Sequence, residues 1–375
     1  MVFTDVSADA GIIHAGTFRH CSAGDFNNDG WWDIAVGDFG NSGTSNVLYR
    51  NNQDGTFTNV AASAGVDSPL RNFGMVLEDF DNDGWMDIFL PKYHYLPEDV
   101  NTSELYRNNG DGTFTNVTPG SGMTTQTDMG HNTGDIDGDG YPDIFIGTGH
   151  PSFKSNDLLL LITPNGAGGF IANNVSQSSG INANGPTRCH GIALGDYDLD
   201  GAIDIYTNNG GPPGQKIYIE ENYLWNNQGN GNNWTSLRLE GVVSNRSAIG
   251  ARAIATTTAG REVHRVLRAG NGFGNTSSPI MHFAIGSDKG IENIEITWPS
   301  GIVQLITQPP MSQIIDVTEH LLGDLDGDGH ISTTDLLLLF GSWGPCRNCA
   351  SCDADLNGDC NVNTVDLLIL FGNWG

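Results

Sequence analysis

Four short stretches of this chain carry carboxylates at the same relative positions. They read DFNNDGWWD (25–33), DFDNDGWMD (79–87), DIDGDGYPD (135–143) and DYDLDGAID (196–204), and we call them loops 1 to 4. Position six is always Gly, which allows a sharp turn because it tolerates positive φ. Hard oxygen atoms at alternate positions of a tight turn are what Ca²⁺ requires, since it takes about six to eight oxygen ligands. The spacing therefore predicts bound calcium, and metal-free solvent turns are the competing interpretation.

The elements that position these loops repeat with them. Apolar residues accompany each loop, at 34–36, 88–90, 144–146 and, in the fourth unit, at 203 and 205–206; they read as buried strands. Between the loops, LYRNN (48–52 and 105–109) precedes TFTNV (56–60 and 113–117), with Asp-Gly turn signals between the two phrases. A degenerate copy covers 158–175 and a shorter one 224–227. Units of about 55 to 60 residues with four short strands are typical of β-propeller blades.

The first residues suggest how such blades could close. The phrase FTDV (3–6) followed by Ala-Gly matches FTNV (57–60) followed by Ala-Gly, whereas the fourth unit lacks this strand after residue 227. Residues 3–6 could complete the fourth blade and remove an exposed edge; the alternative is a larger propeller without its leading blades. Closure would bring Cys21 near Cys189, so we weigh a disulfide there against two separate buried thiols.

The loops and the strands behind them resemble FG-GAP/VCBS repeats, the calcium-binding propeller blades also found in integrin α chains, over about residues 1–231. The resemblance implies a β-propeller with four motif-bearing blades and a Ca²⁺ ion in each loop. Carried over by position, the side-chain ligands are Asp25, Asn27, Asp29, Asp33, Asp79, Asp81, Asp83, Asp87, Asp135, Asp137, Asp139, Asp143, Asp196, Asp198, Asp200 and Asp204. The backbone carbonyls at position seven would come from Trp31, Trp85, Tyr141 and Ala202. Because Asn27 replaces a carboxylate, loop 1 should bind more weakly.

Residues 232–317 contain no such loop and are rich in predicted strands, at 234–239, 250–254, 263–268 and 294–298. In the last of these, Ile294, Ile296 and Trp298 alternate with Glu295 and Thr297, the period of a half-buried strand. The phrases SNRSAIGAR (244–252), HFAIG (282–286) and ITWPSG (296–301) resemble the ASPIC/UnbV domain, which often follows FG-GAP repeats in secreted proteins related to cartilage acidic protein. The resemblance implies a small all-β module without established chemistry.

From residue 320 the pattern changes to two loops that each lead into a short helix. DLDGDGHISTTD (324–335, loop 5) precedes an expected helix at 335–340, and DLNGDCNVNTVD (355–366, loop 6) precedes one at 366–371. Leu336, Leu339, Phe340 and Trp343 fall on one helical face. The duplicated unit, 320–375, resembles a type I dockerin, a small helical module with two EF-hand-like calcium loops that docks onto cohesin modules.

The dockerin resemblance implies further ligands and a partner site. The ligands would be Asp324, Asp326, Asp328, His330, Asp335, Asp355, Asn357, Asp359, Asn361 and Asp366, with His330 and Asn361 at position seven. Cys360 stands where Gly is expected, which makes the geometry of loop 6 less secure. The residues that would read the cohesin are Thr333, Thr334, Thr364 and Val365. Helix N-capping is the competing interpretation of these residues, and a calcium-stabilised tail without a cohesin partner is a further alternative.

Four cysteines lie between the two helices: Cys346, Cys349, Cys352 and Cys360. Their spacing is compatible with Zn²⁺, but in a calcium-rich, secreted small module we favour two disulfides, with three pairings open.

Composition excludes some functions. The formal charge of −28, from 16 basic and 44 acidic residues, disfavours nucleic acid as a partner. No apolar stretch approaches the roughly 20 residues that span a bilayer. No signal peptide is visible, so the expected extracellular or cell-surface location depends on the calcium loops and cysteines. Common hydrolase, metalloprotease and nucleotide-binding motifs are missing from the sequence.

Five residues near the loops could still form a ligand site. His20, His131 and His190 precede loops 1, 3 and 4, and Arg19 and Arg188 accompany two of them. They could line a common channel that binds an anionic or sugar ligand, although ordinary packing at strand ends is the favoured interpretation.

The sequence thus favours a secreted calcium-binding adhesion or interaction protein rather than an enzyme. The propeller would bind a protein or a glycan, and the dockerin would dock onto a cohesin-type partner. The alternative is a dockerin-bearing extracellular polysaccharide lyase or hydrolase with its site on the propeller.

Overall fold

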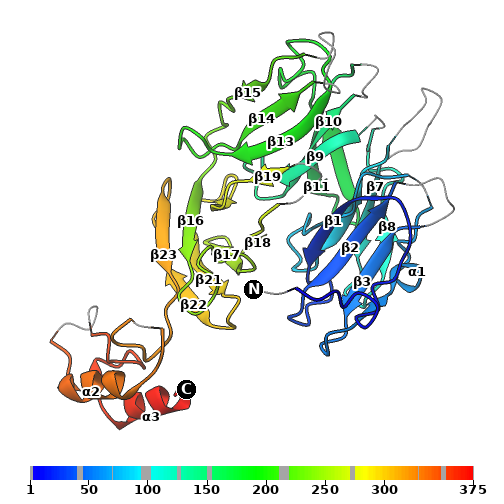
Figure 1. Ribbon diagram of the computed structural model, residues 1–375. Coiled ribbons are helices and arrows are strands. Elements are labelled where there is room, and N and C mark those ends of the chain that lie inside the picture. Colours follow the sequence, from blue (N-terminus) through cyan, green and yellow to red (C-terminus); the bar gives the residue numbers. More distant parts are fainter. Residues whose placement is uncertain are drawn as a thin grey trace.

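A computed structural model describes residues 3–39, 45–69, 71–93, 103–124, 128–149, 154–210, 219–270, 275–327, 329–347 and 352–374. It is mainly β (Figure 1). Three sheets follow one another along the chain, and in each the strand order equals the sequence order. The first contains β1 (Phe18–Gly24), β2 (Asp33–Asp38), β3 (Val47–Asn51) and β4 (Phe57–Asn59); the second contains β5 (Val76–Glu78), β6 (Asp87–Leu90), β7 (Glu104–Asn108) and β8 (Phe114–Asn116); the third contains β9 (Asp128–Gly134), β10 (Asp143–Thr148), β11 (Leu158–Pro164) and β12 (Phe170–Asn174). A short helix, α1 (Ala61–Ala64), follows β4.

Each of these sheets is an antiparallel meander in which the loop connects the first strand to the second. Neighbouring sheets share apolar cores: Leu48 packs with Ile88 between the first and second sheets, and Phe89 with Ile144 between the second and third. The predicted four-strand unit is therefore present, and its apolar runs are the second strands.

The fourth sheet departs from the pattern. It contains β13 (Cys189–Gly195), β14 (Asp204–Asn209) and β15 (Tyr223–Trp225), and its fourth strand is β19 (Thr276–Ser277), which pairs in parallel with β13. The added strand therefore comes from much later in the chain and occupies the opposite edge from the expected one. Among the described residues, β15 forms an outer edge of this sheet.

The expectation that residues 3–6 complete the fourth blade is wrong for this structure. These residues form no strand, and Phe3 is 89% exposed. The turn that follows them is held at the first sheet instead, where the amide of Phe57 donates to the carbonyl of Ala10 (2.8 Å). The amide of Ala172 makes the same contact with Ser121 (2.6 Å) between the second and third units. The described strands do not close into a ring, so a closed propeller stays a prediction.

Two further sheets follow, and they enclose a core of their own. One has the order β20 (Met281–Ala284), β16 (Trp234–Glu240), β23 (Ile314–Thr318); the other has the order β18 (Glu262–Val266), β17 (Arg252–Thr257), β21 (Ile291–Thr297), β22 (Val303–Thr307). The predicted alternation is confirmed, because Ile294, Ile296 and Trp298 are buried in this core while Glu295 is exposed.

A buried histidine should make the stability of this part of the chain depend on pH. Burial lowers the pKa of His282 on β20 to about 3, with a further contribution from Arg265, and its Nδ1 atom lies 2.9 Å from Ser236 Oγ. Because an unfolded His titrates near 6.5, the unfolded state binds more protons between these pKa values, and stability falls as the pH drops below about 6.5. Lowering the pH from 7 to 5 should reduce the free energy of unfolding by about 2 kcal/mol. In urea titrations, His282→Gln should lose this part of the pH dependence; an unchanged dependence would contradict the assignment.

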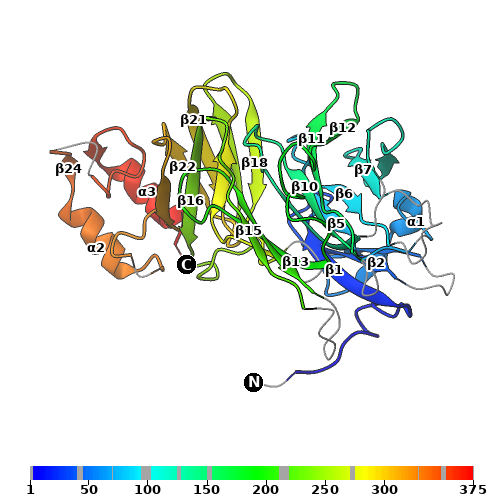
Figure 2. The same cartoon turned by 90° about the horizontal axis from the view of Figure 1, so that it is seen from above.

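The C-terminal segment is a small helical module. Figure 2 shows α2 (Thr333–Gly341) and α3 (Thr364–Gly372) at one end of the molecule, away from the first four sheets. The strands β24 (Gly344–Pro345) and β25 (Asn361–Val362) pair between them. Both helices begin two residues earlier than predicted. The predicted apolar face is buried only in part, since Leu339 is inaccessible whereas Phe340 and Trp343 are nearly half exposed.

Within the part of the chain that the structure describes, no helix is long and apolar enough to cross a membrane.

Candidate metal centres

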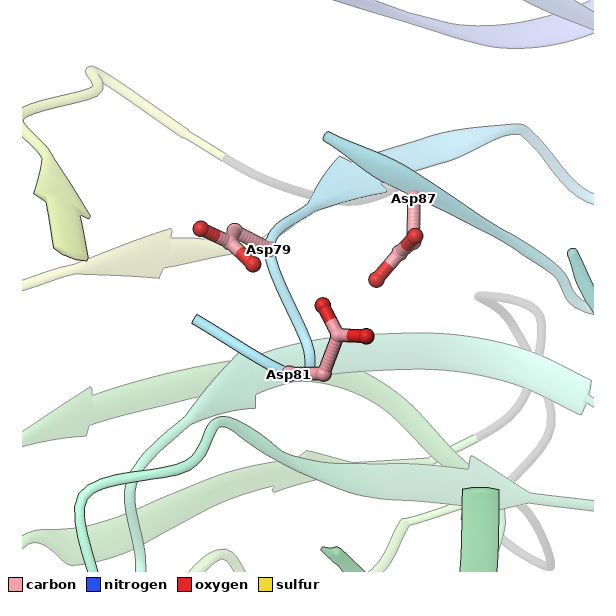
Figure 3. Close-up of side chains that lie close together, drawn as sticks. All are labelled: Asp79, Asp81 and Asp87. Carbon is pink, nitrogen blue, oxygen red and sulfur yellow. The ribbon is translucent and has the colours of Figure 1, made fainter. Parts of the chain in front are cut away.

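Carboxylates converge in loops 2, 3 and 4. In each loop the Asp residues at positions one, three and nine offer oxygen atoms that all lie within 4.8 Å of one another. Figure 3 shows the arrangement in loop 2. The three clusters are Asp79, Asp81 and Asp87; Asp135, Asp137 and Asp143; and Asp196, Asp198 and Asp204. The cluster in loop 4 is the most exposed of the three, because Asp198 lies on the surface.

The Asp at position nine fixes each loop to its sheet. In loop 2, one oxygen of Asp87 accepts from the amide of Phe80 (3.1 Å) and the other accepts from the amide of Asn108 on the third strand (2.8 Å). Equivalent pairs of bonds occur at positions nine of the other three loops, at Asp33, Asp143 and Asp204. This Asp starts the second strand, so its carboxylate joins the loop and two strands.

The Asp at position one closes the turn. Its Oδ2 atom accepts from the amide of the Gly at position six in all four loops, at 2.8 to 3.0 Å. In loops 1, 2 and 4 its Oδ1 atom also accepts from the amide at position five, at 3.1 Å. In loop 3 the amide at position five, that of Asp139, donates to Asp137 Oδ1 instead. Asp135 Oδ1 is therefore buried without a hydrogen-bond partner.

The electrostatics of the clusters favour a cation. The pKa of Asp79 is raised to about 8 and that of Asp135 to about 7, chiefly by burial; neighbouring carboxylates contribute to both shifts, and Arg265 opposes the shift of Asp135. The pKa values of Asp87 and Asp143 also lie well above the usual range, chiefly because of burial. Even with Arg265 beside Asp135, the positive charge near these groups does not keep their pKa values in the usual range, and a metal ion would bind with release of protons.

The donor set matches a hard cation. Every side-chain atom that the clusters offer to a metal is a carboxylate oxygen. Two of these oxygens, Asp81 Oδ1 and Asp135 Oδ1, are buried and have no hydrogen-bond partner. Oxygen-only clusters suit Ca²⁺ or Mg²⁺ and not the nitrogen and sulfur preferences of Zn²⁺. The residues present therefore fit the predicted ion.

Position five is not part of the three-carboxylate clusters. The side chains of Asp29, Asp83, Asp139 and Asp200 instead accept from the amide at position seven, at 2.8 to 2.9 Å. In loop 2, Arg107 bonds both Asp81 (2.8 Å) and Asp83 (2.6 Å). Calcium ligation by position five and by the carbonyls of Trp31, Trp85, Tyr141 and Ala202 stays a prediction.

Loop 1 forms no cluster of three carboxylates, as expected from its asparagine. Asn27 donates through Nδ2 to Asp29 (3.0 Å), so one predicted ligand is hydrogen-bonded to another.

Asparagines that sequence reasoning missed connect consecutive loops. Asn28 and Asn82, at position four, adopt left-handed φ angles of 54° and 55°, which Asn tolerates better than most residues. Their Nδ2 atoms donate to the carbonyls of Gly84 and Gly140 in the following loop, each at 2.8 Å.

Asn108, at the end of the third strand β7, and Asn227, two residues after the third strand β15, also tie their own loop to the preceding one. Their Nδ2 atoms donate to the carbonyls of Phe26 (2.8 Å) and Ile136 (2.7 Å). The recurrence of Asn in the LYRNN phrase was the sequence signal that could have indicated this role.

The fourth carboxylate cluster lies in loop 5 and contains Asp324, Asp326 and Asp335. Asp335 accepts from the amides of Leu325 (2.7 Å) and Ser332 (2.8 Å). In loop 6, Asp366 makes the equivalent bonds with Leu356 and Asn363, while Asn357 donates to Asp359. The remaining predicted ligands are His330, Asp355 and Asn361, which lie in the two loops, and Asp328, which is outside the described residues.

Cys360 adopts the conformation that its position requires. Its φ is 68°, close to the 84° of Gly329 at the same position of loop 5, and its amide donates to Asp355 (2.7 Å). The turn of loop 6 therefore forms without glycine, at a cost of about 1–2 kcal/mol for a left-handed residue with a side chain.

Disulfides form in the predicted cysteine cluster. Cys346 is bonded to Cys352, and Cys360 is also disulfide-bonded, while Cys349 lies outside the described residues. The suggested bond between Cys21 and Cys189 is wrong. Both are free, because Cys21 is exposed on β1 whereas Cys189 is buried in the core between the third and fourth sheets.

The predicted partner residues Thr333, Thr334, Thr364 and Val365 are all exposed. They do not cap the helices, since the N-caps are Ser332 and Asn363, each with a capping box. The competing capping interpretation is therefore wrong, because the cap residue lies one position earlier in the chain.

The predicted histidine cluster forms only in part. His20 and His131 lie with ring centroids 6.0 Å apart, and burial lowers the pKa of His20 to about 4. The arginines are engaged elsewhere: Arg19 stacks on Phe39, and Arg188 forms an ion pair with Glu220. These contacts agree with the favoured interpretation that the side chains pack at strand ends.

Comparison with known proteins identifies three segments. The FG-GAP-like repeat matches residues 25–90 and 95–146, the ASPIC and UnbV domain matches 241–321, and the dockerin type I domain matches 322–372. None of these descriptions is that of a catalytic family.

Curated relatives align with most of this chain. Cartilage acidic protein 1 from Homo sapiens is 25% identical over 325 residues, covering 84% of this chain and 46% of that protein. The Mus musculus protein is 24% identical with nearly equal coverage, so the chain spans about half the length of the curated relatives it matches. The solved V. cholerae biofilm matrix protein Bap1 is 12% identical, with a TM-score of 0.27 over 78% of this chain and 59% of that one, which is too distant to support a conclusion. The chain therefore contains FG-GAP-like repeats followed by an ASPIC/UnbV domain and a type I dockerin domain.

Proposed function

We propose that this chain is an extracellular, calcium-stabilised interaction protein that its dockerin domain attaches to a cohesin-type partner. The observation that carries the proposal is the repetition of one carboxylate cluster in three successive sheets and again in the dockerin. Domain boundaries at 1–231, 232–317 and 320–375 are part of the proposal. We call the first four sheets the FG-GAP sheets and propose that they are arranged as propeller blades. Protein or glycan binding by these sheets is the least defined part of the proposal.

In this proposal calcium supports structure and does no chemistry. When bound, the ion would supply positive charge to the buried carboxylates. The aspartates at positions one, three and nine of loops 2 to 4 would hold it, as would their counterparts in loop 5. The protein's own residues position the loop, since the Asp at position nine accepts hydrogen bonds from backbone amides of the loop and of a neighbouring strand. Such an ion would stabilise the turn between the first two strands of a sheet, and binding would occur on the surface that the sheets form.

The dockerin presents the same exposed apolar side chains on both helices. Leu337 on α2 and Leu368 on α3 are each 70% exposed, and they occupy equivalent positions of the repeat. Near them, Phe340 lies against Trp343, with ring centroids 5.7 Å apart, and Phe371 against Trp374, 5.5 Å apart. Together with the exposed Thr333, Thr334, Thr364 and Val365, these side chains form our proposed docking face.

Replacing Leu337 and Leu368 together by Asp should abolish cohesin binding. Two charges placed in the buried centre of a docking face would each require desolvation, so we expect at least a hundredfold loss of affinity. Biolayer interferometry of the full chain against a panel of cohesin modules provides the measurement. Leu305→Asp is the matched control, because this leucine is 58% exposed on β22, outside the dockerin. If no cohesin binds the native chain, or the double variant binds as well as the control, the docking proposal fails.

A further inference from the structure

Strands β17 and β18 of the ASPIC/UnbV domain face loops 1 to 3 with a row of basic side chains. Figures 1 and 2 show β18 on the side of its sheet that faces the FG-GAP sheets. Four residues contact the loops or the strand before loop 2: Arg252, His264 and Arg265 on the two strands, and Arg268 just after β18. In a chain with only 16 Lys and Arg residues, the presence of three arginines on one edge is informative.

The two ends of the row hold the aspartates at position one of loops 1 and 3. Arg252 forms an ion pair with Asp25, whose side chain is fully buried, and its Nη1 atom lies 3.3 Å from Asn28 Oδ1. Arg265 Nη2 lies 3.1 Å from Asp135 Oδ2 and donates to the carbonyl of Gly140 at 3.1 Å. Both arginines therefore contact buried carboxylates across a domain boundary.

The middle of the row holds loop 2. The backbone amide of His264, on the free edge of β18, donates to Asn82 Oδ1 (3.0 Å), and Arg265 Nη1 reaches the same atom at 3.4 Å. His264 Nδ1 lies 3.9 Å from Asp79 Oδ2. Just before the loop, Arg268 contacts the carbonyl of Leu77 and pairs with Glu78. Asn82 is thus shared between the next loop and the ASPIC/UnbV domain.

The arginine and a cation would use different atoms of the same carboxylate. Arg265 occupies Asp135 Oδ2, whereas the buried Oδ1 atom has no hydrogen-bond partner and belongs to the carboxylate group of loop 3. A guanidinium outside the loop and an ion within it can therefore bind together.

Loop 4 offers a contrast. Its position-one residue, Asp196, has only backbone partners among the described residues, and Leu199 at position four is 60% exposed.

The contact is largely polar, and Val266 of β18 adds an apolar contact with the core between the first two sheets. A cavity of about 680 Å³ lies between loops 1 and 2 and the sheet of β17. The apolar core of the ASPIC/UnbV domain lies between its own two sheets, so the contacts with the loops can loosen without opening that core, while β19 keeps this segment paired with β13 of the fourth sheet.

We propose that the β17–β18 edge is a clamp for loops 1 to 3, and that calcium in these loops and docking of the ASPIC/UnbV domain strengthen each other. This inference rests on the proposed calcium sites. The clamp contacts three groups that the loop turn positions: the carboxylate at position one, the side chain at position four and the carbonyl at position six. Without a cation, the carboxyl groups of a loop either repel one another or take up protons, and both changes weaken the turn and displace these groups. Because coupling between two binding events is reciprocal, docking also favours the calcium-bound turn.

Hydrogen exchange of the His264 amide in the full chain tests the clamp, because this amide donates directly to Asn82. The test variant is Arg252→Gln with Arg265→Gln. The control is Arg238→Gln with Arg246→Gln, which removes the same charge from exposed ion pairs of the same domain. In calcium we expect at least tenfold faster exchange at His264 in the test variant and no change in the control. Exchange of the Ile294 amide, in the domain core, verifies folding, and Arg252→Gln alone repeats the test if the double variant unfolds.

A calcium titration of the same samples separates the two proposals. With EGTA, the native chain should also exchange at least tenfold faster at His264 while Ile294 stays protected. Unchanged exchange at His264 in the arginine variant overturns the clamp. Faster exchange in the variant without an effect of EGTA, in a chain that binds calcium, overturns the coupling alone. Absence of calcium binding overturns the proposed calcium sites, and the comparison of variants still decides whether the clamp exists.

Discussion

EGTA should unfold α2 and α3 while the FG-GAP sheets keep most of their strand structure. Among the described residues of the dockerin, five form its buried apolar core: Ile331, Leu339, Ala354, Val362 and Leu370. A module of fewer than about 60 residues buries too little apolar surface to be stable alone. Each helix also begins at a loop whose last Asp completes the capping box, so loss of the ion would affect loop and helix together.

Amide hydrogen exchange with and without EGTA measures this effect for each helix. Protection of the Leu339 and Leu370 amides should fall to the level of an unfolded chain, whereas that of Ile144 in the third sheet should fall less. Re-addition of excess calcium should restore the helices. Full protection of both helices in EGTA would show that calcium does not hold this domain together.

Replacing Asp143 by Ala should destabilise the chain by about 3–5 kcal/mol in the presence of calcium. The Asp143 carboxylate accepts from the buried amides of Ile136 (2.8 Å) and Ile162 (2.9 Å), and it belongs to the cluster of loop 3. Each buried amide left without a partner costs about 1–3 kcal/mol, and loss of a calcium ligand adds to this.

Urea unfolding measures this loss, and Asp111→Ala is the control. Asp111 is an exposed Asp that only stabilises its own hairpin turn through Thr113, so its loss should cost less than about 1 kcal/mol. With EGTA the Asp143 effect should shrink, because burial keeps the pKa of this group high and the metal-free carboxyl is already costly. Equal effects of the two substitutions would contradict the role of position nine.

Local patterns in the sequence predicted most of the elements. Loops 1 to 4, the apolar strands behind them and the hairpins depend on residues close together in the chain, so their spacing shows directly. Trp298 on the buried face of its strand was predictable for the same reason. The three carboxylates of each cluster in loops 2 to 4 lie within nine residues, and their convergence followed from the turn that the Gly at position six allows.

Features that depend on distant residues were not predictable. Arg265 contacts Asp135 from another domain, and nothing near either residue in the sequence indicates that contact. Residues 3–6 match a strand phrase but have no paired neighbour in this structure, and β19 joins the fourth sheet from the far side instead. The periodicity of α2 suggested that Phe340 would be buried, but a core of two short helices covers only part of each helix.

Isothermal titration of the metal-free full chain with calcium tests the central claim most directly. We expect several ions per chain and at most six, with loops 1 and 6 weakest because Asn27 and Asn357 replace carboxylates. Binding should release protons, detectable as a buffer-dependent heat, because burial raises the pKa values of Asp79 and Asp135. Asp81→Asn should remove one site and leave the others. A chain that binds no calcium at millimolar concentration would contradict the account.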